Sequence, residues 1–403
     1  MRRFFLLPLL GLLLLGLLAF PALGESAGGA ESPEPVARDI SLQCQFNGRS
    51  GASHPLTDGS YTGDFETANQ NGVHSLRITV PEGETAGAVY IQWHMLPVAV
   101  NVQVPGEDGS WTTVADSDGD FYAQYIPLPF LTDFRLVARD DPMTQLRICE
   151  LKVLTPGTPP EGIQLWQKPG DKVDMMLITG HPDDELLWFG GLLPWYEAEQ
   201  GKSVLVVVAA MNRSIRRLEL LDALWACGVR THPVHAVLED FSTGSMNEVF
   251  SRWGSKDFLL RKYTEYYRRY KPDVVVLHDI NGEYGHGIHR TVSWLGRECA
   301  PLAADPSVYP DQVETWGTWD IPKIYIHLYP ENQIRLDWHR PMTAFPGKTA
   351  IQVAQEAIAW HKTQVEHGWA VQDGGEMDNS LFGLYRTLVG PDTEKNDFFE
   401  NIP

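Results

Sequence analysis

Two short clusters of histidines and acids carry the residue types that bind a catalytic metal ion. The first, HPDDE at 181–185, directly follows the apolar run 173–179, and the second, GHGIH, lies at 285–289. Two imidazoles and a carboxylate can hold one divalent ion and leave a fourth position for water, which distinguishes a catalytic zinc from a structural one. Because such an ion both acidifies water and polarises a carbonyl, we expect hydrolysis of an unreactive bond such as an amide.

The elements around the two clusters predict how they meet. The pattern beyond residue 166 alternates strands and helices. The expected strands are 173–179, 203–209, 234–238, 273–277 and 323–328, and the expected helices are 186–200, 216–227, 256–270 and 289–299. Strands that are apolar throughout, such as 204–208, are buried on both faces, so we predict a Rossmann-like parallel sheet covered by helices. Parallel strands end at one edge of their sheet, where open α/β folds bind their ligands, and this would bring the clusters together.

The motifs of this second part resemble the LmbE-like or PIG-L family of zinc-dependent N-deacetylases. The similarity extends over roughly residues 173–364. It rests on HPDDE at 181–185, Gly190-Gly191, Gly201-Lys202, Arg216 with the segment from Glu219 to Gly228-Val229, Tyr284-Gly285-His286 with His289, and the segment from Lys348 to His361 and Gln364. It implies a deacetylase domain over 166–403 that hydrolyses an N-acetyl amide on an amino sugar or glycan. The implied cofactor is Zn²⁺, and another divalent metal such as Fe²⁺ would also suit these ligands.

The resemblance assigns the metal ligands and the base. It implies that His181, Asp184 and His289 bind the metal, and that Asp183 accepts a proton from the attacking water. Glu185 would orient the ligand loop rather than bind the metal.

Other residues would act on the substrate. Tyr284 and His286 match the family's pair that polarises the amide carbonyl or protonates the departing amine. Arg216 and His361 are further candidates for contacts with the substrate. Many family members have an acid directly before the last metal histidine, but this chain has Ile288 there. His286 therefore lacks a charged neighbour that would raise its pKa.

An all-β domain is predicted over residues 39–155. Short alternating runs there, separated by turn residues, are typical of a β-sandwich, with strands expected at 76–80, 88–93, 98–104, 111–114, 134–138 and 146–154. Phrases such as LTDGSY at 56–61 and RICEL at 147–151 resemble the discoidin or galactose-binding jelly roll. This resemblance implies docking to a carbohydrate or a cell surface, and four aromatic residues are candidates for stacking on a glycan: Tyr61, Trp111, Tyr122 and Tyr125. Clustered prolines predict an extended, poorly packed linker at 156–165.

The beginning of the chain has the features of a secretory signal over residues 1–24. Two arginines precede an apolar stretch, which ends in small residues that suit a signal peptidase. A flexible leader is expected at 25–38, and the protein is expected to be secreted or extracytoplasmic. The apolar stretch is nearly long enough to span a bilayer, which leaves an uncleaved membrane anchor as the alternative. In an oxidising compartment Cys44 and Cys149 could pair across the β domain, whereas Cys227 and Cys299 suit buried helical positions.

The charge of the chain limits its partners. A formal net charge of −20 at pH 7 argues against nucleic acid or an anionic membrane surface and suits a neutral or cationic substrate. Two alternative functions use the same features. Two histidines and a carboxylate also form the facial triad of non-haem Fe(II) oxygenases. By resemblance, those enzymes use a β-rich barrel, whereas the motif here interrupts an alternating series of strands and helices. The chain could instead be a secreted glycan-binding protein whose second domain is inactive.

Overall fold

Two antiparallel sheets build the first part of the computed structural model, which describes residues 34–94, 96–211 and 213–403. Their strands are β1 (Gln45–Phe46), β2 (Arg49–Ser50), β3 (Phe65–Glu66), β4 (Asn69–Gln70), β5 (Val73–Thr79), β6 (Ala86–Trp93), β7 (Val100–Pro105), β8 (Trp111–Ser117), β9 (Ala123–Leu131), β10 (Asp133–Ala138) and β11 (Arg147–Leu154). One sheet has the order β2-β1-β5-β10-β7-β8, with β4 paired to β5, and the other has the order β3-β11-β6-β9. Side chains from both sheets, including Leu76, Val89 and Phe134, form one core. This is the sandwich that the alternating pattern predicts.

The pattern does not predict strand β9, because Pro127 and Pro129 interrupt it. In the structure β9 pairs with β6 and is the last strand in the order of its sheet. A proline has no N–H to donate to a neighbouring strand, so it is disfavoured in a central strand. An edge strand tolerates a proline where the missing N–H would point away from the sheet. The position of β9 in the sheet therefore explains why prolines occur in it.

A mixed sheet forms the centre of the second part. Its strands are β12 (Met175–Thr179), β13 (Val204–Ala210), β14 (Val234–Leu238), β15 (Val274–Leu277), β16 (Lys323–His327), β17 (Gln333–Arg335) and β18 (Leu381–Thr387), in the order β14-β13-β12-β15-β16-β18-β17. The pairs from β14 to β16 are parallel, whereas β18 runs antiparallel to both β16 and β17. The second part is therefore an α/β domain with a parallel core and an antiparallel end.

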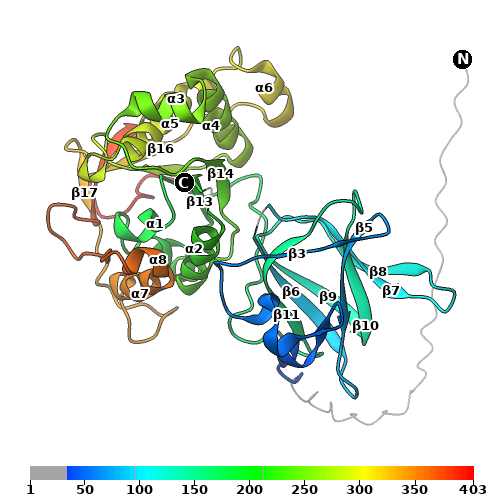
Figure 1. Ribbon diagram of the computed structural model, residues 1–403. Helices are drawn as coiled ribbons and strands as arrows, with labels where there is room; N and C mark the ends of the chain where they lie inside the picture. Colours follow the sequence, from blue (N-terminus) through cyan, green and yellow to red (C-terminus); the bar gives the residue numbers. More distant parts are fainter. Residues whose placement is uncertain (1–33, 95, 212) are drawn as a thin grey trace, which may run out of the picture. The chain divides into compact units, whose positions relative to one another are not determined.

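Helices cover both faces of this sheet. They are α1 (Asp184–Leu187), the π-helical η4 (Pro194–Glu199), α2 (Ser214–Ala226), α3 (Met246–Trp253), α4 (Lys256–Tyr270), the 3₁₀ turn η5 (Glu283–Gly285), α5 (Gly287–Ala304), α6 (Pro310–Trp316), α7 (Ala350–Ala357), the 3₁₀ turn η6 (Ile358–Trp360) and α8 (Lys362–Val365). In Figure 1, α3, α4 and α5 lie on one side of the sheet, and α1, α2 and α7 lie on the other. Neighbouring residues of β13, Val206 and Val207, belong to two different cores. Burial on both faces is what the apolar run 204–208 predicts.

The helix expected over 186–200 is interrupted. The chain forms α1, leaves the helical path, and forms η4 only from Pro194 onward. Gly190 has φ +52°, and a Cβ there would lie 2.6 Å from Oδ1 of Asn379. A left-handed backbone in close contact with another segment requires glycine, and it ends the regular helix at this point.

The linker expected to be poorly packed is instead buried in part. Ile163 and Gln164 are 4% and 3% exposed, and Ile163 belongs to a core that contains side chains from both the sandwich and the α/β domain. Residues 36–403 form a single compact unit. The segment 156–165 is thus packed in part between the sandwich and the α/β domain, and this contact is called the junction below.

Three of the four aromatic candidates for glycan stacking lie at this junction. Tyr122 is 5% exposed, Tyr61 and Tyr125 pack against the same core, and the hydroxyl of Tyr61 donates to Asp222 of α2 at 3.0 Å. Trp111 lies beneath the guanidinium of Arg135, 4.1 Å from the ring centroid. The predicted stacking by Tyr61, Tyr122 and Tyr125 on a solvent-facing glycan is therefore wrong, because the α/β domain packs against the part of the sandwich where these side chains lie.

The expected pairing of Cys44 with Cys149 does not occur in the structure, which has both as free, buried thiols. Cys44 lies in the core of the sandwich, whereas Cys149 points from the opposite face of its sheet toward the α/β domain. Successive residues of a strand point to opposite faces, so strand position alone could not decide the pairing. Cys227 and Cys299 are buried, as predicted.

The predicted signal segment 1–24 and most of the leader lie outside the described residues. Within the described ranges, no helix is long and apolar enough to cross a membrane.

Candidate active site

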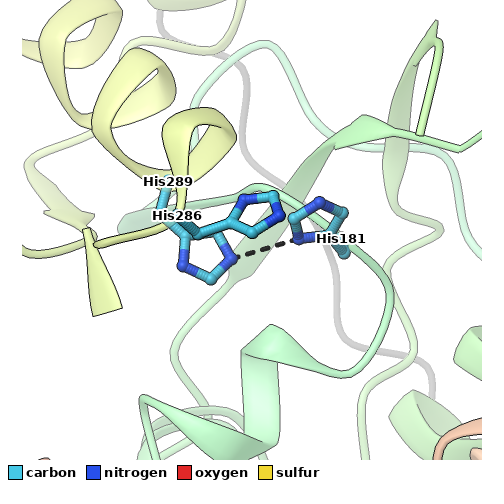
Figure 2. Close-up of side chains that lie close together, drawn as sticks. All are labelled: His181, His286 and His289. Carbon is cyan, nitrogen blue, oxygen red and sulfur yellow. Dashed lines mark hydrogen bonds between the residues drawn. The ribbon is translucent and has the colours of Figure 1, made fainter. Parts of the chain in front are cut away.

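The two sequence clusters lie side by side at one edge of the α/β sheet. β12 and β15 are parallel neighbours, so their carboxyl ends point to the same edge. The segment 181–185 follows β12 and leads into α1, whereas 286–289 begins α5. Figure 2 shows the rings of His286 and His289 at the start of α5, close to the ring of His181. This juxtaposition is the one that the strand pattern predicts.

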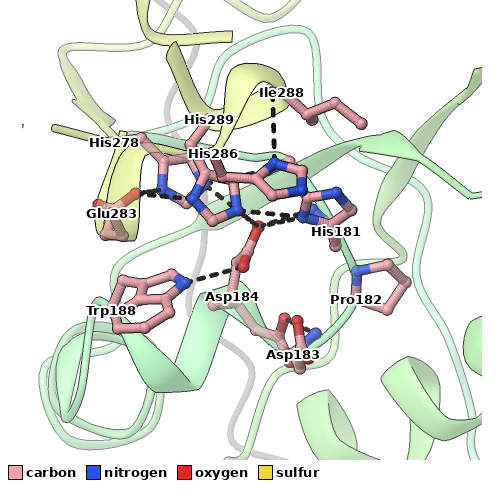
Figure 3. A network of polar contacts seen from close by, with 12 residues as sticks. His181, Pro182, Asp183, Asp184, Trp188, His278, Glu283, His286, Ile288 and His289 are labelled. Atoms are coloured by element: carbon pink, nitrogen blue, oxygen red, sulfur yellow. Dashed lines mark hydrogen bonds and ion pairs between the residues drawn. The ribbon is translucent and has the colours of Figure 1, made fainter. Parts of the chain in front are cut away.

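Three electron-pair donors form a small triangle at this edge (Figure 3). Nδ1 of His181 lies 3.1 Å from Nε2 of His289 and 3.3 Å from Oδ2 of Asp184, and the last two atoms are 3.2 Å apart. Zinc bonds of ordinary length in tetrahedral geometry place neighbouring donor atoms about 3.3 Å apart. Lone pairs this close repel one another unless a proton or a cation lies between them. The donor types and their spacing therefore fit a divalent metal ion.

The electrostatic environment of the triangle favours positive charge. Burial alone would raise the pKa of Asp184, but three surrounding imidazoles hold this pKa well below its usual range. Burial would likewise lower the pKa of His289, but the carboxylates of Asp184 and Glu283 raise it to about 10. A buried site that binds a proton this tightly also suits a metal cation.

Both oxygens of Asp184 are held in place. Oδ1 accepts the indole N–H of Trp188 at 2.9 Å, and Oδ2 accepts the backbone N–H of His181 at 2.7 Å. Gly180 makes room beside the carboxylate, because a Cβ there would lie 2.8 Å from Cδ2 of His289 and 3.1 Å from Oδ2 of Asp184. The strand end and the helix start can thus approach closely enough to share one ion.

Two further histidines lie next to the same triangle. His286 groups with His181 and His289, and His278 groups with Asp184 and His289, at separations that one ion could bridge. Nε2 of His278 already accepts a backbone N–H at 3.0 Å, so its lone pair is engaged. The trio predicted from the sequence is therefore a consistent ligand set, with His286 as its neighbour on the cavity side.

Asp183 is held in an unusual backbone conformation beside the triangle. Its φ is 111°, a value that residues other than glycine rarely adopt and that costs free energy. Its backbone N–H donates to Oε2 of Glu185 at 2.8 Å, and its Oδ2 lies 3.4 Å from Nη2 of Arg216. Burial and the charge of Asp184 raise the pKa of Asp183 to about 8, against the opposing charge of Arg216. Such a carboxyl group can take up a proton near neutral pH.

Arg216 is a buried side chain with several partners. Its Nη1 lies 2.5 Å from Oδ2 of Asp240, and its Nη2 donates to the carbonyl oxygen of Pro182 at 2.5 Å. These contacts fix the guanidinium beside Asp183. Arg216 also lines the cavity, so the substrate contact suggested by the sequence stays a prediction.

His286 and Tyr284 face the cavity as hydrogen-bond donors. Nδ1 of His286 accepts the backbone N–H of Ile288 at 3.3 Å, which leaves the ring proton of the neutral form on Nε2. Burial and the neighbouring imidazoles lower the pKa of His286 to about 3, so the ring is neutral at neutral pH. Burial also raises the pKa of Tyr284, which keeps its hydroxyl protonated. The absence of an acid at position 288 thus favours carbonyl polarisation over proton donation by His286.

Glu283 connects several of these histidines, although no sequence motif indicates it. Its Oε2 lies 2.6 Å from Nδ1 of His278 and 3.0 Å from Nδ1 of His289, and its Oε1 lies 2.8 Å from Nδ1 of His327. All four side chains have no solvent exposure. A carboxylate behind a ligand histidine fixes the ring and increases its basicity. Glu283 therefore orients His289 toward the triangle.

Substituting Glu283 by glutamine is expected to weaken metal binding by roughly 10–100-fold, as is typical when such a supporting group is lost. The amide keeps the shape of the side chain but places a donor against ring nitrogens that need an acceptor. Metal affinity is measured by competition with a chromogenic chelator. Glu107→Gln on an exposed loop is the matched control, and unchanged affinity in Glu283→Gln would show that Glu283 does not support the site.

His361 does not line the cavity, so the predicted substrate contact is revised. Its ring is fully buried, and Nε2 lies 2.7 Å from Oε1 of Glu185. Glu185 in turn accepts the backbone N–H of Asp183, in line with its expected orienting role. His361 is thus connected to Asp183 through Glu185, whereas Gln364, one turn further along, does line the cavity.

A cavity of about 250 Å³ opens onto the triangle. It is lined by His181, Asp183, Asp184, Leu187, Trp188, Arg216, Asp240, Phe241, Ser242, Tyr284, His286, Gln364 and Trp369. One wall is aromatic, with ring centroids of Trp188, Tyr284 and Trp369 separated by 5.6–6.0 Å. Neither Asp240 nor Trp369 is indicated by the sequence motifs. Asp240 follows β14 and could have been found from its place after a parallel strand, but Trp369 lies in an irregular segment without such a signal.

Several known proteins are similar to parts of this chain. The model of the PIG-L family, described as GlcNAc-PI de-N-acetylase, matches residues 176–300. A 1D-myo-inositol 2-acetamido-2-deoxy-α-D-glucopyranoside deacetylase of Catenulispora acidiphila is 28% identical over 185 residues, which are 39% of this chain and 56% of the relative. A deacetylase of the same description from Geodermatophilus obscurus is 26% identical over 189 residues, covering 40% of this chain and 63% of the relative.

Solved structures also match each part of the chain. N,N′-diacetylchitobiose deacetylase from Pyrococcus horikoshii covers 49% of this chain and 72% of its own, with 18% identity and a TM-score of 0.37. The family 32 carbohydrate-binding module of C. perfringens NanJ covers 30% of this chain and 99% of its own, with 14% identity and a TM-score of 0.23. Over residues 176–300 this chain is therefore similar to the PIG-L family.

Proposed function

We propose that the protein is a metal-dependent N-deacetylase that hydrolyses the N-acetyl amide of an amino sugar or glycan. The observation that carries the proposal is the triangle of His181, Asp184 and His289. His181 and Asp184 line one cavity together with Asp183, and His289 is buried behind them. The relatives that match the chain are described as deacetylases of a 2-acetamido sugar, which supports the substrate class.

The metal would be held by His181, Asp184 and His289, and when bound it would acidify water and polarise the amide carbonyl. Asp183 takes the proton of the attacking water, and a bond forms between the water oxygen and the carbonyl carbon. His286 through Nε2–H and Tyr284 through its hydroxyl donate to the carbonyl oxygen as it gains negative charge. Asp183 then passes its proton to the amide nitrogen as the C–N bond breaks. The products are acetate and the free amine.

The cavity offers different surfaces to the two faces of a sugar. The wall of Trp188, Tyr284 and Trp369 suits the C–H face of a pyranose ring, whereas the polar side, with Arg216 and Asp240, suits its hydroxyls. The amide would thereby be presented to Asp183.

Trp369→Ala is expected to raise KM for an N-acetylated sugar about tenfold and to change kcat little, because the ring supplies binding rather than chemistry. The control substrate is a small acyclic acetamide, whose KM should stay the same in the variant. Steady-state kinetics with both substrates measure the effect. Equal KM values for the sugar in wild type and variant would remove Trp369 from the binding wall.

Acetate release tests the proposed function directly. Purified protein of known metal content is incubated with N-acetylglucosamine, N,N′-diacetylchitobiose and an N-acetylglucosaminyl inositol. We expect acetate and free amine in equal amounts from at least one of them. A metal-loaded protein that releases acetate from none of the three would contradict the proposal.

The proposal extends to features that the sequence predicts. We propose that the bound metal is Zn²⁺, that the parallel strands β14 to β16 form the Rossmann-like core implied by the family, and that residues 1–24 direct export. The alternative of a non-haem Fe(II) oxygenase requires oxygen for turnover, and acetate release under anaerobic conditions separates the two. A glycan-binding protein without activity would release no acetate.

A further inference from the structure

A second cavity, of about 690 Å³, lies apart from the active-site cavity and shares no lining residue with it. It is lined by the sandwich sheet on one side and by α2 and η6 on the other. Its lining includes Tyr61, Tyr90, Gln92, Gln164, Asp222, Trp225 and Trp360. The cavity does not take part in the proposed hydrolysis.

A network of polar side chains is fixed in this cavity. Asp222 accepts the hydroxyl of Tyr61 at 3.0 Å and the amide of Gln164 at 2.7 Å, and Gln92 donates to the Tyr61 oxygen at 2.9 Å. Gln92 and Gln164 are 5% and 3% exposed. Carboxylates and amides whose orientation is fixed in this way are suited to binding hydroxyl groups of a ligand.

The hydroxyl of Tyr90 could form a further hydrogen bond with a ligand. Tyr90 is 1% exposed, its side chain lines the cavity, and its Oη makes no hydrogen bond of regular geometry among the described residues, with only the backbone N–H of Gln164 near it. A buried hydroxyl without a partner costs free energy, so such groups call for an explanation. A polar ligand in the cavity would supply the missing hydrogen bond.

The aromatic and charged residues narrow the class of ligand. Trp360 is 45% exposed, and Trp225 carries the guanidinium of Arg230 3.8 Å from its ring centroid. The charged lining residues Lys152, Arg230, Glu161 and Asp222 balance in sign. Flat aromatic surfaces beside hydroxyl-binding groups, without net charge, suit a ligand with both apolar C–H faces and hydroxyls.

We propose that this cavity is a binding site for a neutral saccharide, which is held at the junction of the sandwich and the α/β domain. The sugar stacks on Trp360 and hydrogen-bonds to Asp222 and to the hydroxyl of Tyr90. The site differs from the solvent-facing glycan site expected from the sequence, because it lies on the sheet face that packs against α2. It is independent of the proposed deacetylation.

Binding of galactose, cellobiose and N-acetylglucosamine to the full chain, followed by tryptophan fluorescence and saturation-transfer NMR, tests this site. We expect at least one of the three probes to bind, and Trp360→Ala to weaken its affinity about tenfold through loss of stacking. Tyr90→Phe should also weaken binding while leaving the melting temperature of the sugar-free protein unchanged or higher, since the deleted hydroxyl makes no regular hydrogen bond there.

Trp369→Ala is the matched control, because Trp369 lines only the active-site cavity and its loss should not change binding at the second site. Failure of all three probes to bind would overturn the proposal. Binding that persists unchanged in both Trp360→Ala and Tyr90→Phe, or that is lost in Trp369→Ala, would place the sugar elsewhere and would also overturn it. Acetate release, measured separately, is unaffected by either result.

Discussion

Asp183→Asn is expected to lower kcat by roughly 10²–10⁴-fold, the range for loss of a general base. Asparagine has the same shape as aspartate and keeps the backbone N–H that donates to Glu185, so the loop should stay in place. It cannot accept the proton of water, and it cannot return a proton to the departing amine. The measurement is kcat for acetate release from an N-acetylated sugar that wild type hydrolyses.

The variant must keep its metal for this result to be informative. Asp183 is not among the three donors of the triangle, so the metal content of Asp183→Asn should equal that of wild type. Asp108→Asn, on an exposed turn of the sandwich, controls for a general effect of losing one carboxylate. If Asp183→Asn turned over at the wild-type rate with its metal bound, another group would have to be the base.

The strained backbone at Asp183 gives this prediction a structural basis. Both Asp183 and Tyr284 have positive φ, at 111° and 44°, and both line the cavity. Residues other than glycine hold such conformations only when the surrounding fold enforces them. Here the enforcing contacts are Glu185 and Arg216 around Asp183. The strained backbone therefore lowers the stability of the fold, but it directs the proposed base toward the cavity.

The proximity of the proposed ligand trio and the proposed base could be predicted because each cluster is contiguous in the sequence and follows an apolar strand. HPDDE at 181–185 contains His181, Asp183 and Asp184 in one loop, and the order of the strands brings His289 to the same edge. Residues that act from elsewhere were not predictable in the same way. Glu283 looks like an ordinary acid in a turn until the fold places it behind His289.

His361 shows the limit of local pattern more clearly. Its spacing from Gln364 is one helical turn, which suggests a pair on one face. The backbone breaks between η6 and α8, and His361 turns inward to Glu185 while Gln364 faces the cavity. Only the packing of this segment against the ligand loop could assign a different role to each residue.

The junction between the domains was likewise beyond the sequence pattern. Alternation along β6 and β11 indicates which residues share a face, but it does not indicate whether that face meets water or another domain. Tyr61, Tyr122 and Cys149 all lie at this junction. The sequence had suggested glycan stacking for the two tyrosines and a disulfide bond with Cys44 for Cys149. One packing event, that of α2 against this sheet, accounts for all three corrections.

Removing the metal is expected to reduce activity by roughly 10³-fold or more, because polarisation of the carbonyl and activation of water contribute several kcal/mol to the barrier. The three donor atoms would then face one another at 3.1–3.3 Å without a cation between them. We therefore expect the stripped protein to melt at a lower temperature as well, since an ion that binds only the folded state stabilises it. Stoichiometric Zn²⁺ should restore both activity and melting temperature.

His289→Ala is the variant that links this result to the triangle. The substitution removes one donor and leaves His181 and Asp184, so added Zn²⁺ should restore neither full activity nor the melting temperature. His339→Ala, at an exposed histidine, is the matched control and should respond to chelation and to Zn²⁺ as wild type does. Full turnover by protein that metal analysis shows to be stripped would mean that hydrolysis needs no ion at this site. Since the spacing of the three donors is the basis of the proposed function, such a result would leave the cavity without its source of activated water.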